Sequence, residues 1–327
     1  MRYESSVTSI SWIPSEAITG PMRVPMDVGI GRYDSPPPDH IDGDFLDAKD
    51  RFRFANNLKA HIDVEDGRVV AAGYEGRGVI GATVVHLGSR SVSIPAVAFP
   101  EIRSEPEITE NGVKFQQTAG GRTGSPMPRR ISRPPFVQLV APTAWTTLSL
   151  FIGLDGSATF ELAGASPFPR HWIYDSEGAL SKKSGVIDFA KWAAENTHDR
   201  SPWFDHDLDA MVSEVESPTE RELSVEIMRG TADLRRFRPG EAMLTQGETG
   251  SEVLLILDGI VEISVDGEAV AVAGPGSIMG ERAALEGGVR TATVRAKTPV
   301  RVAVTQATDL DRQSLAEVAI LHRREEG

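Results

Sequence analysis

The chain has 327 residues, 40% of them hydrophobic, and its 34 Lys and Arg against 47 Asp and Glu give a formal net charge of −13. This length exceeds what one hydrophobic core usually holds, so we expect two domains. The acidic balance disfavours nucleic acid and anionic membranes as partners, because the summed field repels phosphates. The absence of cysteine excludes disulfides, thiolate catalysis and cysteine-based metal sites.

The first residues give no targeting signal. The stretch MRYESSVTSISWIP lacks a basic region followed by an apolar core, and no apolar run of ~18 residues occurs in the chain. We therefore expect a cytoplasmic protein that is not attached to a membrane.

Residues 1–215 are predicted to form a β-rich domain, a sandwich or barrel with few helices. Alternating apolar runs flank the turn at Glu65–Gly67 and predict a β-hairpin there. Helical patterns occur only at 44–54 and 186–195. The expected strands are 58–64, 68–72, 79–87, 91–97, 113–117, 136–140, 146–152 and 158–162.

One aromatic stretch in this region, Pro167–Asp175, contains His171 and could line a pocket with that histidine as a general base. A structural corner is the favoured interpretation. The acidic run at 198–209 matches no metal-ligand spacing, so we assign no metal site and leave any catalytic residue unknown.

A domain boundary is predicted at Ser217. The sequence Ser217-Pro218-Thr219-Glu220 combines a capping box with proline at the first helical position, and the helix should end at Gly230. Residues 217–327 therefore form the second predicted domain.

After this helix come short apolar runs separated by glycine turns, among them Asp266-Gly267, which is typical of a jelly roll. A last helix is expected over 309–326, with apolar contacts from Leu310, Leu315, Val318, Ala319 and Leu321. The expected strands are 253–257, 261–265, 269–273, 291–296 and 300–304.

The stretch from Gly280 to Val294, GERAALEGGVRTATV, is the strongest functional signal in the chain. Gly280 allows the backbone to approach a ligand, and the helix formers after Glu281 can build a short turn whose free N–H groups attract an anion. Arg290 would bring a planar, permanently charged guanidinium to the same anion. These groups suit a ligand with a phosphate and a sugar hydroxyl.

This stretch resembles the phosphate-binding cassette of cyclic nucleotide-binding domains, the family of the catabolite activator and the protein kinase A regulatory subunits. Phe237–Glu241, Gln246–Glu252 and Leu257–Gly259 agree with that family in order and spacing. Three glycine-anchored motifs in one order are far more specific than a single glycine pattern. The resemblance covers residues 217–327 and implies a jelly roll with flanking helices.

The resemblance also implies roles for individual residues. Glu281 would hold the ribose 2′-hydroxyl through its carboxylate, Arg290 would contact the cyclic phosphate, and the amides of Ala283 and Ala284 would contact the phosphate oxygens, while Gly280 lets the backbone approach the ligand. Thr291 follows the arginine. A hydroxyl there accompanies guanine recognition in some relatives and is tolerated by cAMP binders in others. The expected ligand is therefore cAMP or cGMP, as a regulatory ligand and not as a cofactor.

The chain is predicted to be a cyclic nucleotide sensor whose N-terminal domain acts as an effector or binds a protein partner. Only about twenty residues follow the predicted jelly roll, too few for a helix-turn-helix module, and the sequence contains no kinase or P-loop phosphate-binding motif. Two alternatives stay open, an N-terminal enzyme gated by the nucleotide and a scaffold protein with a degenerate site. The oligomeric state is also open.

Overall fold

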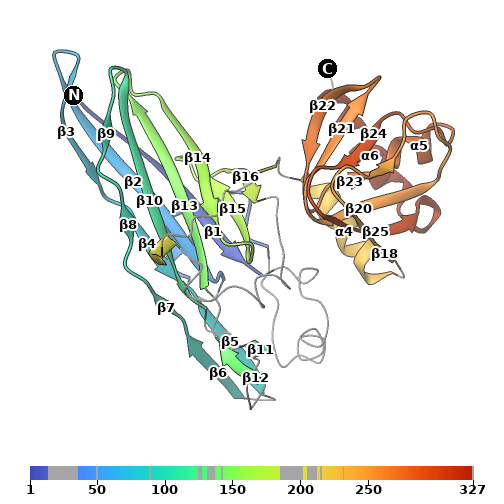
Figure 1. The fold of residues 1–327 in the computed structure, drawn as a ribbon, viewed down its shortest axis with the longest axis horizontal. Coiled ribbons are helices and arrows are strands. Elements are labelled where there is room, and N and C mark those ends of the chain that lie inside the picture. Colours follow the sequence, from blue (N-terminus) through green and yellow to red (C-terminus); the bar gives the residue numbers. More distant parts are fainter. Residues whose placement is uncertain are drawn as a thin grey trace. The chain divides into compact units, whose positions relative to one another are not determined.

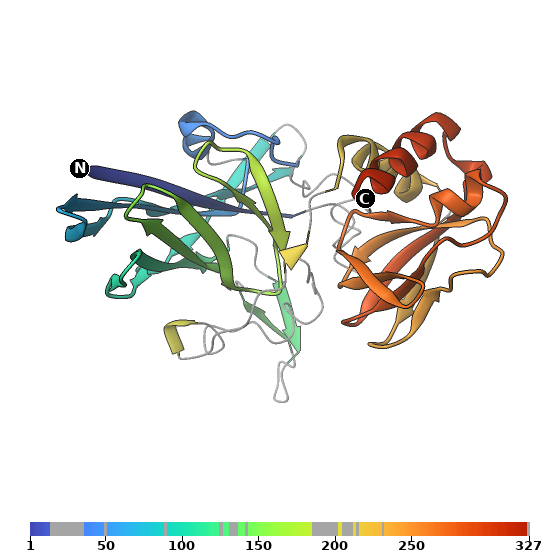
Figure 2. The same ribbon diagram turned by 90° about the horizontal axis from the view of Figure 1, so that it is seen from above.

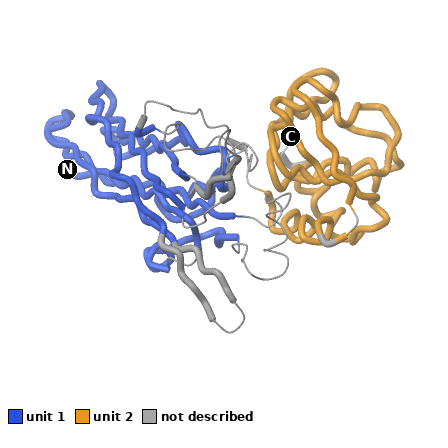
Figure 3. The backbone as a smooth tube through the Cα atoms, turned by 60° about the horizontal axis from the view of Figure 1, so that its bottom comes forward, with its two compact units in different colours: residues 1–184, 188–210 blue, residues 185–187, 211–327 orange. Residues whose placement is uncertain are grey.

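The computed structural model forms two compact units, residues 1–184 with 188–210 and residues 185–187 with 211–327 (Figure 3). No helix in the described part of the chain is long and apolar enough to cross a membrane. The structure describes residues 1–13, 36–48, 51–87, 90–123, 127–130, 137–140, 143–184, 202–204, 212–213, 216–230 and 232–325.

The first unit is built from two antiparallel sheets (Figure 1). One has the strand order β16-β15-β1-β2-β3, with β4 beside β2, and the other has the order β14-β13-β10-β7, with β8 and β9 beside β10. Two further strand pairs are β5–β6 and β11–β12. The bounds are β1 Arg2–Trp12, β2 Phe54–Glu65, β3 Arg68–Tyr74, β4 Arg77–Ile80, β5 Ala82–Leu87, β6 Arg90–Pro95, β7 Val97–Ala98, β8 Ile102–Arg103, β9 Glu107–Ile108, β10 Gly112–Arg122, β11 Met127–Arg130, β12 Val137–Val140, β13 Thr143–Gly153, β14 Ala158–Ala165, β15 Arg170–Tyr174 and β16 Leu180–Ser184, with a short helix α2 at Gly43–Asp47 and a 3₁₀ turn at Pro202–Phe204. The short strand β17, Val212–Ser213, falls among the residues of the second unit.

The two large sheets pack face to face as a sandwich, because alternate residues of their strands supply one shared core. On β2, Leu58, Ala60 and Ile62 are fully buried, and they pack with Phe115 on β10 and Leu148 on β13. The period-2 alternation of strands places these side chains on one face. The mainly β fold predicted for residues 1–215 is therefore confirmed.

A polar layer lies inside the same sandwich. The Asn56 amide donates to the backbone oxygen of Thr146 at 2.9 Å and accepts from Gln117 Nε2 at 2.8 Å. Ser9 Oγ and Thr146 Oγ1 are 2.6 Å apart. Because each of these side chains has a partner, the sandwich holds polar groups without the cost of burying them unsatisfied.

The hairpin predicted at Glu65–Gly67 is confirmed: β2 pairs with β3, and Asp66 and Gly67 have φ angles of 48° and 72°. Positive φ at both central residues matches the right-handed twist of the strands. The helix predicted over 44–54 is wrong beyond Asp47, because Phe54 starts β2 and pairs with both β1 and β4. The helix expected over 186–195 lies outside the described residues.

The second unit is a jelly roll of two four-stranded sheets, with orders β18-β25-β20-β23 and β19-β24-β21-β22. The jelly roll predicted for this region is confirmed. Its helices α4 and α6 lie together on one side of the roll (Figure 2). The bounds are α4 Pro218–Arg229, β18 Asp233–Phe237, β19 Ala242–Leu244, β20 Glu252–Asp258, β21 Val261–Val265, β22 Glu268–Ala273, β23 Ile278–Met279, α5 Glu281–Leu285, β24 Thr293–Ala296, β25 Val300–Gln306, a 3₁₀ turn at Ala307–Asp309 and α6 Arg312–Glu325.

Strand β20 separates two cores of this unit. Leu254 and Ile256 point into the roll, whereas Val253, Leu255 and Leu257 pack with the helices on the opposite side. Leu223 and Ile227 of α4 and Leu315 and Val318 of α6 complete that second core. The helices are therefore held by apolar packing on the back of β20, which pairs with β23, the strand directly before Gly280.

The helix start predicted at Ser217 is confirmed. Ser217 Oγ accepts from the backbone N–H of Glu220 at 3.2 Å, and the Glu220 carboxylate accepts from the backbone N–H of Ser217 at 2.8 Å. This reciprocal pair fixes the side chain of Glu220 at the first turn of α4.

We expect Asn56→Ala to destabilise the first unit by about 2–4 kcal/mol, because it leaves a cavity and unpartnered groups on Gln117 and Thr146. Chemical denaturation of the full chain, followed by hydrogen exchange at β10 and β13, measures this loss. Lys59→Gln is the control, since its ion pairs are on the surface and should change stability by less than about 1 kcal/mol. Equal stability of the two variants would contradict a structural role for the polar layer.

Candidate functional site

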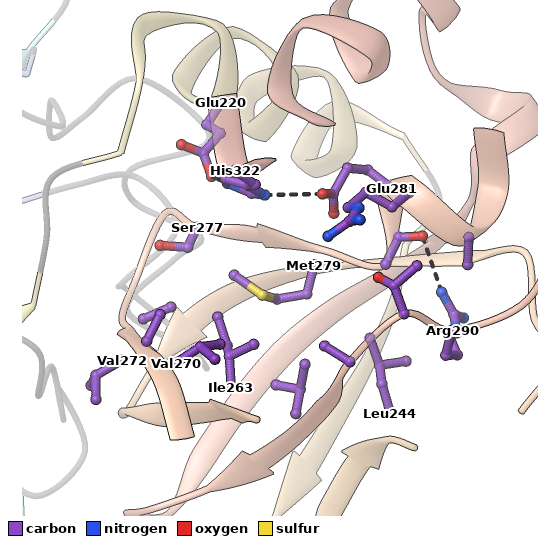
Figure 4. Close-up of a pocket in the computed structure, with 18 of the residues that line it drawn as sticks. Glu220, Leu244, Ile263, Val270, Val272, Ser277, Met279, Glu281, Arg290 and His322 are labelled. Atoms are coloured by element: carbon purple, nitrogen blue, oxygen red, sulfur yellow. Dashed lines mark hydrogen bonds and ion pairs between the residues drawn. The ribbon is translucent and has the colours of Figure 1, made fainter. Parts of the chain in front are cut away.

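A cavity of about 130 Å³ lies in the second unit between the jelly roll and the helices (Figure 4). Apolar side chains of the jelly roll line one part of the cavity, and charged side chains line the other. The apolar residues are Leu244, Ile263, Val270, Val272 and Met279, and the charged residues are Glu216, Glu220, Glu281, Arg282, Arg290 and His322.

The guanidinium of Arg290 lies between two glycines. A Cβ on Gly250 would be 2.7 Å from Arg290 Nη2, and a Cβ on Gly280 would be 2.5 Å from Nη1. Gly280 also has a φ of +90°, which residues with a side chain rarely adopt. Both glycines are therefore needed for the position of the arginine, one from the loop before β20 and one from the start of α5.

Arg290 is 5% exposed, and its Nη1 donates to the backbone oxygen of Gly280 at 3.1 Å. Burial lowers the pKa of the guanidinium, and this effect outweighs the negative charges of Glu252, Glu281 and Glu248, which raise it. No carboxylate of the described residues lies within ion-pair distance of it. Because arginine stays protonated, the cavity holds a buried cation that no carboxylate of the described residues pairs with.

Glu281 is the first residue of α5 and is 3% exposed. Its Oε1 is 2.9 Å from Nδ1 of His322, which comes from α6. Of the residues predicted from the sequence, Gly280, Glu281, Ala283, Arg290 and Thr291 all line the cavity. Ala284 does not, and it packs against the core beneath the helices, where its N–H makes a long bond of 3.4 Å to the oxygen of Gly280.

Four charged residues of the cavity were not among the predicted site residues: Glu216, Glu220, Arg282 and His322. His322 contacts the carboxylates of both Glu281 and Glu220, with its Nε2 3.3 Å from Glu220 Oε1. Burial opposes the charged imidazole, but the hydrogen bonds to Glu220 and Glu281 outweigh it and raise the pKa of His322 to about 10. The sequence did contain a signal for His322, because this residue continues the helical spacing of Leu315, Val318 and Ala319 and therefore lies on the buried face of α6.

His171, the candidate base of the first unit, is fully buried. Its Nδ1 is 2.8 Å from Ser11 Oγ, and its Nε2 is 2.9 Å from the backbone oxygen of Ser166. Burial lowers its pKa to about 4, although the bond to Ser166 opposes this. A neutral, enclosed imidazole has no access to a substrate, so its position fits the structural corner.

Residues 234–315 match the family model described as the cyclic nucleotide-binding domain. Similar solved structures include the N-terminal domain of a transcriptional regulator from Streptomyces coelicolor A3(2), 28% identical over 32% of this chain and 81% of that one, with a TM-score of 0.25. The cAMP-bound PfPKA-R (141–441) is 26% identical over 32% and 42%, with a TM-score of 0.25. The Thermus thermophilus catabolite activator protein is 25% identical over 33% and 55%, with a TM-score of 0.27.

The matched segment contains the roll from β18 to the start of α6, and the cavity opens on the same roll. The family expected from the glycine motifs is thus confirmed for this part of the chain.

Proposed function

We propose that this chain is a cytoplasmic sensor of a cyclic purine ribonucleotide, with cAMP as the first ligand to test. In this proposal the second unit binds the nucleotide in the cavity beside α5. The first unit serves as the effector or the partner-binding module of the sensor.

The observation that carries the proposal is the buried guanidinium of Arg290. A buried charge that no neighbouring carboxylate pairs with is costly, so an anionic ligand in the cavity would gain a charge-assisted, two-pronged contact. The cyclic phosphate carries one negative charge and two exocyclic oxygens that suit the planar donors of arginine. Contacts from the amides of Ala283 and Ala284 to this phosphate remain part of the proposal.

Glu281 supports the choice of a ribose. Its carboxylate lines the same cavity as Arg290, and an ionised carboxylate is a strong acceptor for a sugar hydroxyl. The apolar wall formed by Ile263, Val270 and Val272 offers a surface for the flat face of a base. Thr291 lines the cavity and is compatible with adenine or guanine, so cAMP and cGMP are both tested.

A binding role suits the first unit better than catalysis. His171, the residue considered there as a base, is enclosed between Ser11 and Ser166. The sandwich is an ordered framework on which strand edges and loops can present a surface to a partner. Signalling would require that nucleotide binding change α4, since this helix follows directly on the connection from the first unit.

Thermal unfolding of the full chain with cAMP, cGMP, 5′-AMP and inorganic phosphate tests the ligand class. A ligand at 100 times its dissociation constant should stabilise the native state by about 2.7 kcal/mol. We expect this shift with at least one cyclic nucleotide and not with 5′-AMP or phosphate. The chain is first unfolded and refolded to remove any co-purified ligand, and a flat response to both cyclic nucleotides would then contradict the proposal.

We expect Arg290→Ala to weaken binding of the cyclic nucleotide by about two to three decades, because a desolvated charge pair contributes roughly 3–5 kcal/mol when one partner is removed. Isothermal titration measures the affinity. Arg236→Ala is the matched control, since Arg236 is exposed on β18 and does not line the cavity. If Arg290→Ala and Arg236→Ala bind equally well, the phosphate lies elsewhere.

Hydrogen exchange tests the signalling part of the proposal. Addition of cAMP should change protection in α4, where Leu223 and Ile227 pack against the roll, and also in strands of the first unit. A two-state element responds to a ligand only through differential affinity for its states. Protection confined to residues 280–294 would mean that the second unit binds nucleotide without signalling to the first.

A further inference from the structure

His322 joins three helices at the cavity. It projects from α6 between the carboxylate of Glu281 on α5 and that of Glu220 on α4 (Figure 4). The side chains of both glutamates are less than one-tenth exposed, at 4% and 7%. Because each ring nitrogen faces a carboxylate at hydrogen-bond distance, the imidazole serves as a shared counter-ion for two buried anions.

The two carboxylates differ in how firmly they are held. Glu220 is fixed by the backbone N–H groups of Ser217 at 2.8 Å and of Ile278 at 3.0 Å, in addition to His322. The carboxylate of Glu281 has one hydrogen bond in the described structure, the bond to His322. The position of the Glu281 carboxylate therefore depends on an imidazole that is itself anchored to Glu220.

Charge strengthens this dependence. Two buried carboxylates close to one cation would repel each other without it. Glu220 would stay in place, since its oxygens also accept two backbone N–H groups. Removal of the imidazole would thus displace mainly the carboxylate of Glu281, whose hydrogen bond in the described structure is the one to His322. Glu216, Arg282 and Arg290 are the other charged groups around the cavity.

We propose that His322 is the positioning residue for Glu281, whose carboxylate it holds in place and directs at the 2′-hydroxyl of a bound cyclic ribonucleotide. This inference rests on the proposed function and adds the residue by which the site distinguishes ribose from deoxyribose. It also links recognition of the sugar to α4 and α6, because the same imidazole contacts all three helices. The carboxylate keeps lone pairs for the ribose, since an ionised carboxylate accepts about four hydrogen bonds.

The experiment compares cAMP with 2′-deoxy-cAMP by titration of the full chain. A hydrogen bond to a charged group corresponds to an affinity ratio of about 10–100 between the two ligands for the unmodified protein. We expect His322→Gln to reduce this ratio to a few-fold while the affinity for 2′-deoxy-cAMP changes little. Glu281→Gln should reduce the ratio in the same way.

The control on the same helix is Ile320→Gln, because Ile320 is exposed and lies outside the cavity. It should leave the ratio unchanged. If His322→Gln weakens both ligands equally, the histidine has only a structural role and the inference is overturned. If the unmodified chain binds neither ligand, the proposed function itself fails, so the two failures are distinguishable.

A pH series adds a measurement that a purely structural role would not affect. For the unmodified protein the ratio should be flat from pH 6 to 8.5, because the imidazole stays protonated until about pH 10. The ratio should fall as the pH rises through that value, because the imidazole then loses its charge. This measurement uses the unmodified protein, so it tests the inference even if His322→Gln does not fold. In His322→Gln the ratio should stay at its reduced value over the whole range. A ratio in the unmodified protein that does not change as the pH passes 10 would contradict the inference.

Discussion

The second unit is organised around the burial of one guanidinium. Arg290 fits only because Gly250 and Gly280 lack side chains at the points of closest approach, and Gly280 in its left-handed conformation also starts α5 and places Glu281 at the cavity. One backbone geometry thus brings a fixed positive charge and a carboxylate to opposite parts of one small site. A buried arginine of this kind favours an anion over water, because bulk solvent is excluded from the contact.

The volume of the cavity bears on how such a ligand would be accommodated. About 130 Å³ is small beside the roughly 300–1,000 Å³ of typical small-molecule pockets. The jelly roll is held by its own core, and the helices rest on a separate one. The helices can therefore move without disrupting the core of the roll, and α4 and α6 carry Glu220 and His322 of the cavity. Ligand entry and helix position are coupled by this division of the cores.

The sequence predicted correctly those features that depend on interactions between residues close together in the chain. The hairpin at Asp66-Gly67 and the capping box at Ser217 follow from residues within four positions of each other. Strand β1 was not predicted, because its hydroxyl-rich sequence is buried only through pairing with β2 and β15, far away in the chain. The helix expected over 44–54 ends at Asp47, and its predicted C-terminal end was wrong for the same reason, since Phe54 pairs with β1 and this pairing takes precedence over local helix propensity. His322 was missed because its partners lie 41 and 102 residues away.

The two units also use buried polar groups differently. In the first unit, Asn56 and Gln117 bond to each other and His171 bonds to its neighbours, so the donors and acceptors named here are used within the fold. Such a layer fixes the register of the two sheets and contributes to a unique structure. In the second unit, Arg290 and Glu281 are as deeply buried, yet they face a cavity and have few partners. Polar groups whose bonding is completed by the fold stabilise it, whereas buried polar groups that face a cavity can bind a ligand, and this difference supports the proposal that the second unit binds the nucleotide.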